Sequence, residues 1–495
     1  MKLLYIDLFC GAGGTSTGIE NARYEGRQCA KVIGCVNHDA NAIASHAANH
    51  PDALHFTEDI RTLELSPLIA HLAEMRRQYP DAFVVLWASL ECTNFSKAKG
   101  GQPRDADSRT LAEHLFRYIE AIEPDYIQIE NVEEFMSWGD LDENGKPISK
   151  DAGRLYQQWV SNVRGYGYRF AHRILNSADF GAYTSRRRFF GIFAKGSLPI
   201  VFPDPTHCKE GTTGLFGQMK RWKPVREVLD FTDEGESIFG RKKPLVDATL
   251  ERIYAGLIKF VAGGKEAFLV KWNSMSQTGK YHAPSIDEPC PTVATQNRLG
   301  IAQVNFLSKH YGGNPAGKCV SVEEPAGTIT TWDHHSFITA YYGNGHNHSI
   351  DAPAPTLTTR DRLAFVDMQY GNGTPCGIET PAPTVTTNPK HQLVTCRMKQ
   401  QGATIAVTTD DSPAMAKIKR FMALYGIIDI KMRMLRIPEL KRIMGFPSDY
   451  VLVGTQADQK KFIGNAVEVN MARVLCEALC ARLIEGDWRP IQIAA

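Results

Sequence analysis

The sequence predicts an α/β protein with a parallel sheet and a long β-rich insertion. Three observations indicate this class. Short apolar runs alternate with helix-length amphipathic stretches in the first part of the chain. Near residue 197 this alternation gives way to sequence rich in Pro, Gly, Thr and Asn, and it returns near the end. We therefore predict an α/β domain at 1–197, a β-rich domain at 198–430 and a C-terminal segment at 431–495 that rejoins the first domain.

The expected strands of the first domain are apolar runs of about four to eight residues, typical of strands buried on both faces. They cover residues 3–9, 31–36, 53–56, 83–87, 126–129, 168–175 and 187–193. Between them, apolar residues recur with helical spacing. The expected helices begin at Ile19 and cover 40–50, 67–79, 111–122 and 155–163, followed after the insertion by a short helix at 437–447 and a longer one at 470–484.

A glycine-rich turn, CGAGGTSTG, follows the first expected strand. Its Gly11, Gly13 and Gly14 allow a backbone to approach a ligand closely, and a helix N-terminus offers free N–H groups. The glycines are clustered, unlike the dinucleotide fingerprint GxGxxG. The turn therefore predicts a nucleotide-type cofactor, and a tight turn without a ligand is the alternative.

Polar residues also end the second expected strand, at Asn37 and His38. A polar group at this position is where a ribose hydroxyl would bind in an open α/β sheet. Three histidines follow, His46, His50 and His55. We predict them to be solvated or helix-end residues, because no companion spacing supports a metal.

Chemically useful side chains follow the central strands. Cys92 comes shortly after the apolar run 83–87, where a nucleophile would be placed, although a lone cysteine there is more often a buried, inert residue. Glu130 closes the run 126–129, and a carboxylate at such a position is costly unless it has a partner or a role. Three arginines, 186–188, enter an apolar strand, so at least one is expected to point inward at an anion or carbonyl.

Composition and charge set the broad class. The formal net charge of +2 names no partner, although residues 390–442 carry eleven Lys and Arg against four Asp and Glu. The eleven cysteines are scattered without a CxxC pair, and Cys476 and Cys480 have helical spacing that indicates core packing. Without a signal-peptide pattern or a membrane-length apolar run, we expect a reduced, cytoplasmic protein.

An internal repeat marks the insertion. Four segments of the form Pro-x-x-Thr-x-x-Thr align with threonines at 292, 328, 356 and 384, and Tyr-Gly-Asn-type turns lie between them. This pattern predicts β-hairpin units with glycine turns. They are either a structural β-array or a set of polar loops that present side chains to a nucleic-acid groove.

Six elements in a fixed order carry a family resemblance. They are Asp7–Gly14 (DLFCGAGG); Cys92 with Phe95-Ser96; Glu130-Asn131-Val132; Arg186 with Arg188; Arg436 and Glu439 with Gly445-Phe446-Pro447; and Gly464-Asn465-Ala466-Val467. In content and order they resemble the cytosine-5 DNA methyltransferase family. The resemblance covers about residues 1–195 and 431–485, and the family keeps its variable target-recognition domain in between. It implies a Rossmann-like, S-adenosylmethionine-dependent domain with a large inserted recognition domain.

The resemblance implies a mechanism. The thiolate of Cys92 would add to C6 of a flipped-out cytosine and so make C5 nucleophilic enough to take a methyl group. Glu130 would share a proton with ring N3. Arg188 and Arg186 would hold the ring carbonyl. The loop of Lys97, Lys99, Gly100 and Gly101 would close on the DNA.

The resemblance also implies S-adenosylmethionine as methyl donor, S-adenosylhomocysteine as product, and no metal. Phe9 would pack on the adenine, and Gly11, Gly13 and Gly14 would approach the amino-acid end. Asp59 would contact the adenine amino group and Asn465 the methionine end. Asp7, Asn37 and His38 complete the expected cofactor set.

The chain departs from the family pattern at several positions. It has Glu91-Cys92-Thr93 where Pro-Cys-Gln is usual, Asn37 for glutamate, Thr184 for glutamine and Glu468 for proline. A glutamate pointing at the thiol would raise its pKa. Because Cys92, Glu130 and the arginines remain, we expect an active enzyme of a divergent branch.

Two alternatives stay open: a tRNA cytosine-5 methyltransferase, and a catalytically inactive DNA-binding protein. About 230 residues separate Lys195 from Lys431, enough for a DNA-reading domain, which favours double-stranded DNA as the partner. The resemblance implies a monomer that acts in restriction-modification, in a phage or as an orphan methylase. The sequence leaves open the target site and whether a cognate restriction endonuclease exists.

Overall fold

The structure is a computed structural model of the chain. It describes residues 1–90, 112–140, 152–214, 217–230, 235–258, 407–425 and 427–490, together with 142, 148, 232–233 and seven short strands between 267 and 398. The chain divides into two compact units, one formed by Met1–Arg221 with Met444–Ala495 and the other by Trp222–Ile443. Each unit is described by itself.

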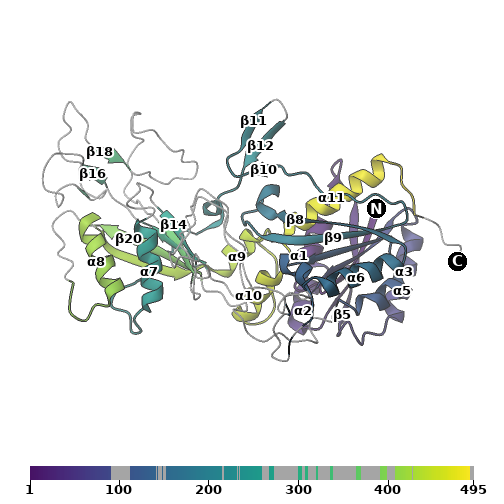
Figure 1. Cartoon of the computed structure of the whole chain (residues 1–495), viewed down its shortest axis with the longest axis horizontal. Coiled ribbons are helices and arrows are strands. Elements are labelled where there is room, and N and C mark those ends of the chain that lie inside the picture. Colours follow the sequence, from purple (N-terminus) through teal and green to yellow (C-terminus); the bar gives the residue numbers. More distant parts are fainter. Residues whose placement is uncertain are drawn as a thin grey trace. The chain divides into compact units, whose positions relative to one another are not determined.

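The first unit contains a seven-stranded sheet in the order β5-β4-β1-β6-β7-β9-β8 (Figure 1). The five strands from β5 to β7 are parallel, and β9 and β8 complete the sheet in antiparallel pairs. The strands are β1 (Leu3–Leu8), β4 (Ala30–Asn37), β5 (Leu54–Thr57), β6 (Phe83–Ser89), β7 (Tyr126–Asn131), β8 (Tyr168–Asn176) and β9 (Arg187–Lys195). All seven predicted strands are confirmed, each to within a few residues. β2 (Arg23–Tyr24) and β3 (Arg27–Gln28) form a small hairpin.

The helices of the first unit also follow the prediction, except for the start of the first helix and for the helix at Gln456–Asn465, which was not predicted. They are α1 (Gly14–Glu20), α2 (Ala40–Asn49), α3 (Ser66–Gln78), α5 (Leu115–Ile122), α6 (Arg154–Gly165), α10 (Gln456–Asn465) and α11 (Val469–Glu485). The predicted start of α1 at Ile19 is wrong, because the helix begins at Gly14 despite its poor helix formers. A Cβ on Gly14 would lie 2.6 Å from the Val467 carbonyl oxygen, and one on Gly18 would lie 2.4 Å from that of Val469. Close packing against the segment that opens α11 therefore requires glycine here.

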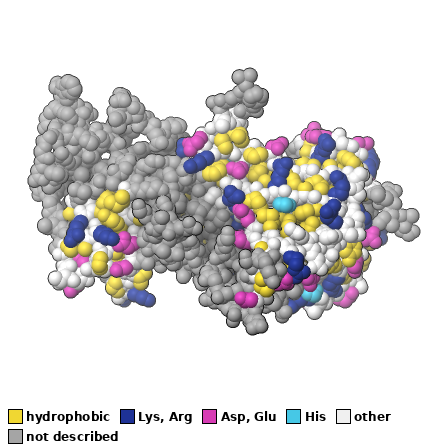
Figure 2. Space-filling model, viewed as in Figure 1, with side chains coloured by type: hydrophobic (Ala, Val, Ile, Leu, Met, Phe, Trp, Pro, Cys, Tyr) yellow, Lys and Arg dark blue, Asp and Glu magenta, His cyan; other side chains and the backbone are white. Residues whose placement is uncertain are grey.

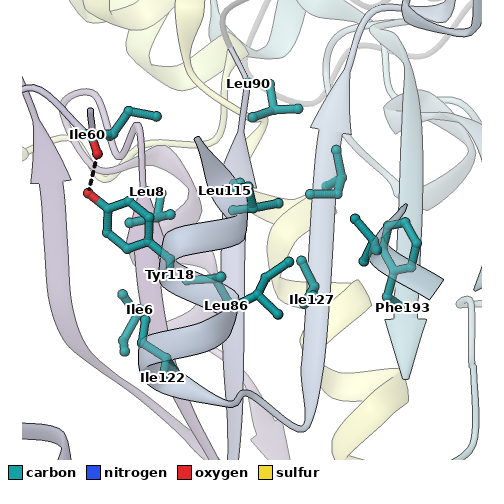
Figure 3. Close-up of a cluster of buried hydrophobic side chains, with 14 of the residues drawn as sticks. Ile6, Leu8, Ile60, Leu86, Leu90, Leu115, Tyr118, Ile122, Ile127 and Phe193 are labelled. Carbon is teal, nitrogen blue, oxygen red and sulfur yellow. Dashed lines mark hydrogen bonds between the residues drawn. The ribbon is translucent and has the colours of Figure 1, made fainter. Parts of the chain in front are cut away.

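The core follows from the alternation of side chains along each strand. In β1, Leu4, Ile6 and Leu8 face one side of the sheet, where α3, α5 and α6 cover them. Figure 3 shows part of this cluster, including the hydroxyl of Tyr118, which donates to the carbonyl of Ile60 at 2.9 Å. Leu3 and Tyr5 face the other side, where the buried residues of α1 and α11 lie. The C-terminal helix thus covers a face of the N-terminal strand.

The boundaries of the units differ from those predicted at 197/198 and 430/431. Residues after β9 pack back on the sheet: Tyr126 Oη donates to the Pro199 carbonyl at 3.0 Å, and Leu198, Ile200 and Phe202 pack on the core. A small sheet of β10 (His207–Cys208), β12 (Gly217–Arg221) and β11 (Thr212–Gly214) follows in the same unit. At the other end, β21 (Ile427–Met434) crosses the predicted boundary.

The second unit is built on a six-stranded sheet whose main path is β13-β21-β20-β15-β14, with β19 paired to β20. These are Glu236–Ser237, Ile427–Met434, His391–Met398, Leu299–Gln303, Ala267–Lys271 and Ala364–Met368. A second sheet joins β17 (Cys319–Val320), β16 (Leu307–Lys309) and β18 (His335–Phe337). The β-rich prediction omitted α7 (Asp247–Gly256) and α8 (Pro413–Tyr425), whereas α9 (Ile437–Ile443) begins where a helix was predicted. The four repeat segments lie outside the described residues.

The described surface gives two further facts. Figure 2 shows basic and acidic side chains interspersed over the described part of the first unit in this view, in keeping with a net charge of only +2. In the part of the chain that the structure describes, the helices are too short or too polar to cross a membrane.

Candidate active site

Most of the predicted site residues lie at the carboxyl edge of the seven-stranded sheet. Phe9 and the glycines follow β1, Asn37 ends β4 and His38 follows it, Asp59 follows β5, and Glu130 lies near the end of β7. These strands are parallel, so their carboxyl ends meet at one edge. This edge is where open α/β sheets bind ligands.

The turn after β1 is held in an unusual backbone conformation. Phe9 has a φ of 60°, in the left-handed region that a bulky residue rarely adopts, and Gly11 and Gly13 have φ values of 52° and 99°. The hydroxyl of Tyr450 donates to the Ala12 carbonyl at 2.5 Å, and a Cβ on Gly13 would lie 2.3 Å from that hydroxyl. Strain of this kind persists where the surroundings impose it and often marks a functional site.

Asp7 lies beneath this turn, fully buried. Its Oδ2 accepts a hydrogen bond from Ser16 Oγ at 2.8 Å, while Oδ1 has no hydrogen-bond partner among the described residues. Burial raises the pKa of Asp7 well above its ordinary value, and the Ser16 hydrogen bond acts against this. The side chain therefore supports the turn from below and is not exposed to a ligand.

Some polar groups at the ends of β4 and β5 are already hydrogen-bonded or paired, and others are exposed. Asn37 Oδ1 accepts from the Asp39 amide at 2.9 Å, and His38 is exposed. The carboxylate of Asp59 is bound by the Arg61 side chain, with Nη2 to Oδ2 at 2.6 Å, and this hydrogen bond lowers the pKa of Asp59. Asp39 pairs with Lys461 of α10 at 3.1 Å, which brings the C-terminal segment to the end of β4.

Two of the nearby histidines lie at the end of α2, as predicted, but they are not solvated. His46 is in the last turn of the helix and His50 is its C-cap. Both are buried and hydrogen-bonded, because α2 turns them inward against α1. His50 Nδ1 lies 2.7 Å from Glu20 Oε2, and its Nε2 lies 3.2 Å from Tyr450 Oη. His55 is half-buried.

Glu130 forms a buried ion pair with Arg188. Arg188 Nε lies 3.3 Å from Glu130 Oε1, and the two side chains are 11% and 7% exposed. Burial raises the pKa of Glu130, while the charges of Arg186 and then Arg188 act against this. Opposing effects of burial and nearby charge on a carboxyl group are common where that group takes part in proton transfer.

The three consecutive arginines have different surroundings. The prediction that at least one of them points inward at an anion or a carbonyl is confirmed by Arg186. Arg186 is buried, and its Nη1 donates to the Gly464 carbonyl at 3.2 Å. Arg187 is exposed and pairs with Glu133 at 2.9 Å. Arg186 thereby ties the start of β9 to the end of α10, where Asn465 is exposed.

The predicted nucleophile Cys92 lies outside the described residues, as do Glu91, Thr93, Lys97, Lys99, Gly100 and Gly101. The preceding strand is described. Ser89, three residues before Cys92 in the sequence, is aligned with Glu130 in the parallel pairing of β6 with β7. Beside Glu130, Asn131 is buried, and its Nδ2 has no hydrogen-bond partner among the described residues.

Sequence reasoning missed two residues that support the site. Tyr450, which holds the turn after β1, has no signal in the sequence that distinguishes it from a core aromatic. Glu468, noted only as a departure from the family, is the N-cap of α11: it is buried and accepts from the amides of Asn470 and Met471 at 3.2 and 2.7 Å. An acidic residue just before an amphipathic helix is a capping signal that could have identified it.

Several known proteins are similar to this chain. The family model described as C-5 cytosine-specific DNA methylase matches residues 3–234 and 326–481. Type II methyltransferase M1.HphI of Haemophilus parahaemolyticus is 27% identical over 216 residues, 43% of this chain and 52% of that protein. M.AgeI of Thalassovita gelatinovora is 28% identical over 211 residues, 42% and 44% of the two chains. The matched part thus spans about half the length of these relatives.

Among solved structures, the Dnmt2 methyltransferase of S. pombe aligns over 98% of this chain and 100% of its own, with 14% identity and a TM-score of 0.47. The match that identifies the family is the sequence-based one. The family model covers well over half of the chain, including the whole seven-stranded sheet and most of α11. The chain belongs to the C-5 cytosine-specific DNA methylase family.

Proposed function

We propose that the protein transfers a methyl group from S-adenosylmethionine to C5 of a cytosine in double-stranded DNA. The observation that carries the proposal is the buried pair of Glu130 and Arg188, 3.3 Å apart. It lies beside the strand that leads in sequence to Cys92. An acid, a cation and a thiol are the groups that addition to a cytosine ring requires.

The residues at the edge of the sheet fit S-adenosylmethionine, which when bound supplies an electrophilic methyl group. A Cβ built on Gly11 meets no described atom within 4 Å, so there is open space beside the turn. His38 and Asn465 are exposed, and Asp59 is half-exposed. A ligand that contacts the Asp59 carboxylate would have to share it with Arg61 or displace Arg61. Phe9 would offer a ring face to the adenine. Asp7 would support the turn after β1, and Asn37 would support the turn after β4.

In this mechanism the Cys92 thiolate forms a bond to C6 of the cytosine, and the displaced electron pair makes C5 nucleophilic. Glu130 donates or shares its proton with ring N3, which accepts the developing charge. After methylation a base removes the proton from C5, and the electron pair released there expels Cys92. Before any of these steps the target cytosine must leave the duplex, because C5 and C6 are inaccessible within it.

The pKa of Glu130 fits this role. A carboxyl group at its ordinary pKa would be ionised at pH 7 and could not protonate the ring, whereas burial raises the pKa of Glu130. Arg188 lowers it again, so the proton can be shared and is not permanently held. Arg186 positions this end of β9 through the Gly464 carbonyl, and we assign Arg188 the contact with the ring.

We assign target recognition to the long region between the two parts of the α/β domain, predicted at 198–430. Its length favours DNA over tRNA, and the relatives M1.HphI and M.AgeI are named type II methyltransferases. A cognate restriction endonuclease and a monomeric enzyme are parts of the same proposal.

The test is methyl transfer from labelled S-adenosylmethionine to mixed-sequence duplex DNA and bulk tRNA, offered in parallel. Modified bases are then located by bisulfite sequencing. We expect label in DNA at a fixed short motif, and none in DNA when Cys92 is replaced by Ser. Label only in tRNA would replace the proposal with the RNA alternative, and full activity of Cys92→Ser would remove the covalent mechanism.

A further inference from the structure

A cluster of metal-ligand side chains lies below the turn after β1, apart from Glu130 and the arginines. Cys10 lies in the turn, Cys35 in β4 and His46 in α2, all buried. Their sulfur and nitrogen ligand atoms all lie within 4.8 Å of one another. His55 of β5 contacts one member of this group, with its Nε2 3.0 Å from His46 Nδ1.

The hydrogen bonds of His46 determine which nitrogen can bind a metal. Its Nε2 lies 2.9 Å from Ser16 Oγ, and Ser16 Oγ donates to Asp7 Oδ2 at 2.8 Å. Since the Ser16 proton is committed to Asp7, Ser16 Oγ accepts from Nε2–H. The lone pair of Nδ1 then faces Cys35 Sγ at 3.6 Å and His55 Nε2. A carboxylate or hydroxyl behind the second nitrogen is what orients histidines in metal sites.

We propose that Cys10, Cys35, His46 and His55 bind one Zn²⁺ in a Cys₂His₂ site. Ligands at about 2.3 Å for sulfur and about 2.0 Å for nitrogen in a tetrahedron are about 3.3 to 3.8 Å apart. The 3.6 Å between Cys35 Sγ and His46 Nδ1 lies in this range, and the 3.0 Å between the histidines is slightly short of it. Two thiolates and Zn²⁺ also sum to zero charge, which a buried site favours.

Zinc binding should depend on pH. Zn²⁺ takes thiolates and neutral imidazoles as ligands, so binding releases the protons that the free side chains hold. Zinc affinity should therefore fall as the pH is lowered.

A second group of thiols provides an internal control. Cys29, Cys476 and Cys480 also have sulfur atoms within 4.8 Å of one another, and all three are buried. This group has three thiols and no imidazole, and its members pack among the apolar side chains that join α11 to the sheet. It can therefore report whether any metal found depends on the mixed cluster or simply on buried sulfur.

The zinc would connect the turn after β1 with three later elements that follow one another in sequence. Cys10 follows Phe9 directly, whereas Cys35, His46 and His55 belong to β4, α2 and β5. The ion would fix the turn after β1 to these elements and help to hold Phe9 in its left-handed conformation. Its loss should therefore lower the stability of the first unit.

The test measures zinc by plasma mass spectrometry in the full chain, after Zn²⁺ is added and the excess is removed by dialysis. We expect about one zinc per chain, retained by Cys476→Ser and lost by Cys35→Ser and His46→Gln. The metal-free protein should bind Co²⁺ with the d–d bands and thiolate charge-transfer band of a tetrahedral site. Chelation should lower the Tm of the wild type and of Cys476→Ser.

Two results would overturn the site. One is a folded wild-type protein that retains no zinc and shows no tetrahedral Co²⁺ spectrum. The other is zinc that survives both Cys35→Ser and His46→Gln, or that disappears in Cys476→Ser alone. If the buried variants fail to fold, His55→Gln provides the test, because His55 is only half-buried. A chelator should remove zinc from this variant faster than from the wild type. Equal rates of removal would contradict the proposal.

Discussion

Two buried carboxyl groups lie near the carboxyl ends of strands in the same sheet, and their surroundings differ. Among the described residues, Asp7 of β1 accepts a side-chain hydrogen bond from the Ser16 hydroxyl alone, whereas Glu130 of β7 lies beside two arginines. Burial raises the pKa of both. Two cations act against this effect at Glu130, whereas a neutral hydroxyl does so at Asp7. We therefore assign proton exchange to Glu130 and a structural role to Asp7.

Replacing Glu130 by Gln tests the first half of this comparison and should have the largest effect. Gln keeps the size of the side chain but cannot give up a proton, so kcat should fall by about 10³-fold or more. Some stability should also be lost, because the neutral amide leaves the nearly buried Arg188 without its ionic partner. Steady-state kinetics with duplex DNA, beside a thermal melt, measures both. A folded variant with an unchanged rate would remove Glu130 from the chemistry.

Arg188→Ala removes the ion-pair partner of Glu130 and should have the next largest effect, with a loss of about 10²-fold in kcat. The pKa of Glu130 should rise further, because one of the two charges that act against burial is gone. The acid limb of the pH–rate profile, followed by methyl transfer from about pH 5 to 9, should move upward.

Arg187→Ala is the matched control for Arg188→Ala. Its side chain is exposed and pairs with Glu133 at the surface, a contact worth less than about 1 kcal/mol. The rate and pH profile should stay those of the wild type. If Arg187→Ala and Arg188→Ala lost the same activity, the buried pair would have no special role.

Asp7→Asn tests the second half of the comparison through the pH dependence of stability. The pKa of Asp7 is raised on folding, so the folded state retains a proton that the unfolded state loses above about pH 4. Stability of the wild type therefore falls as the pH rises from there to the folded-state pKa, by about 1.4 kcal/mol per pH unit from this group. The variant lacks this loss. Urea unfolding of both proteins at several pH values should give curves that diverge as the pH rises, and parallel curves would show that Asp7 is ionised.

Glu468 extends the comparison to a third buried carboxyl group, which binds backbone amides. Glu468→Ala leaves the amides of Asn470 and Met471 without their acceptor and should cost about 1 kcal/mol of unfolding free energy. Denaturant unfolding measures the loss, and Glu468→Asp should recover part of it. An unaffected midpoint in Glu468→Ala would mean that solvent caps the helix equally well.

The sequence predicted the parts of the fold that periodicity controls. Apolar runs placed all seven strands of the sheet, and helical spacing placed α2, α3 and α6 to within a few residues. Polar residues after the strands placed Glu130, Asn37 and Asp59 at one edge, because the carboxyl ends of parallel strands converge. The pairing of Arg188 with Glu130 was not predictable, because it depends on the antiparallel alignment of β9 with β7.

What the sequence could not predict depends on contacts between distant segments. The start of α1 at Gly14 follows from its packing against the Val467 carbonyl. His46 looks like a solvated helical residue until α2 turns it toward Ser16 and Cys35. The helices α7 and α8 were hidden within a composition that, averaged over the insertion, favours turns and strands.

The position of α11 has a consequence for synthesis of the protein. Its residues Met471, Leu475 and Leu479 share a core with Leu3 and Tyr5 of the first strand. During translation that face of the sheet remains uncovered while the long central region is made, and it can close only when residue 483 has left the ribosome. A nascent chain stalled within the central region would therefore expose a large apolar surface, and we expect it to be a chaperone substrate until release.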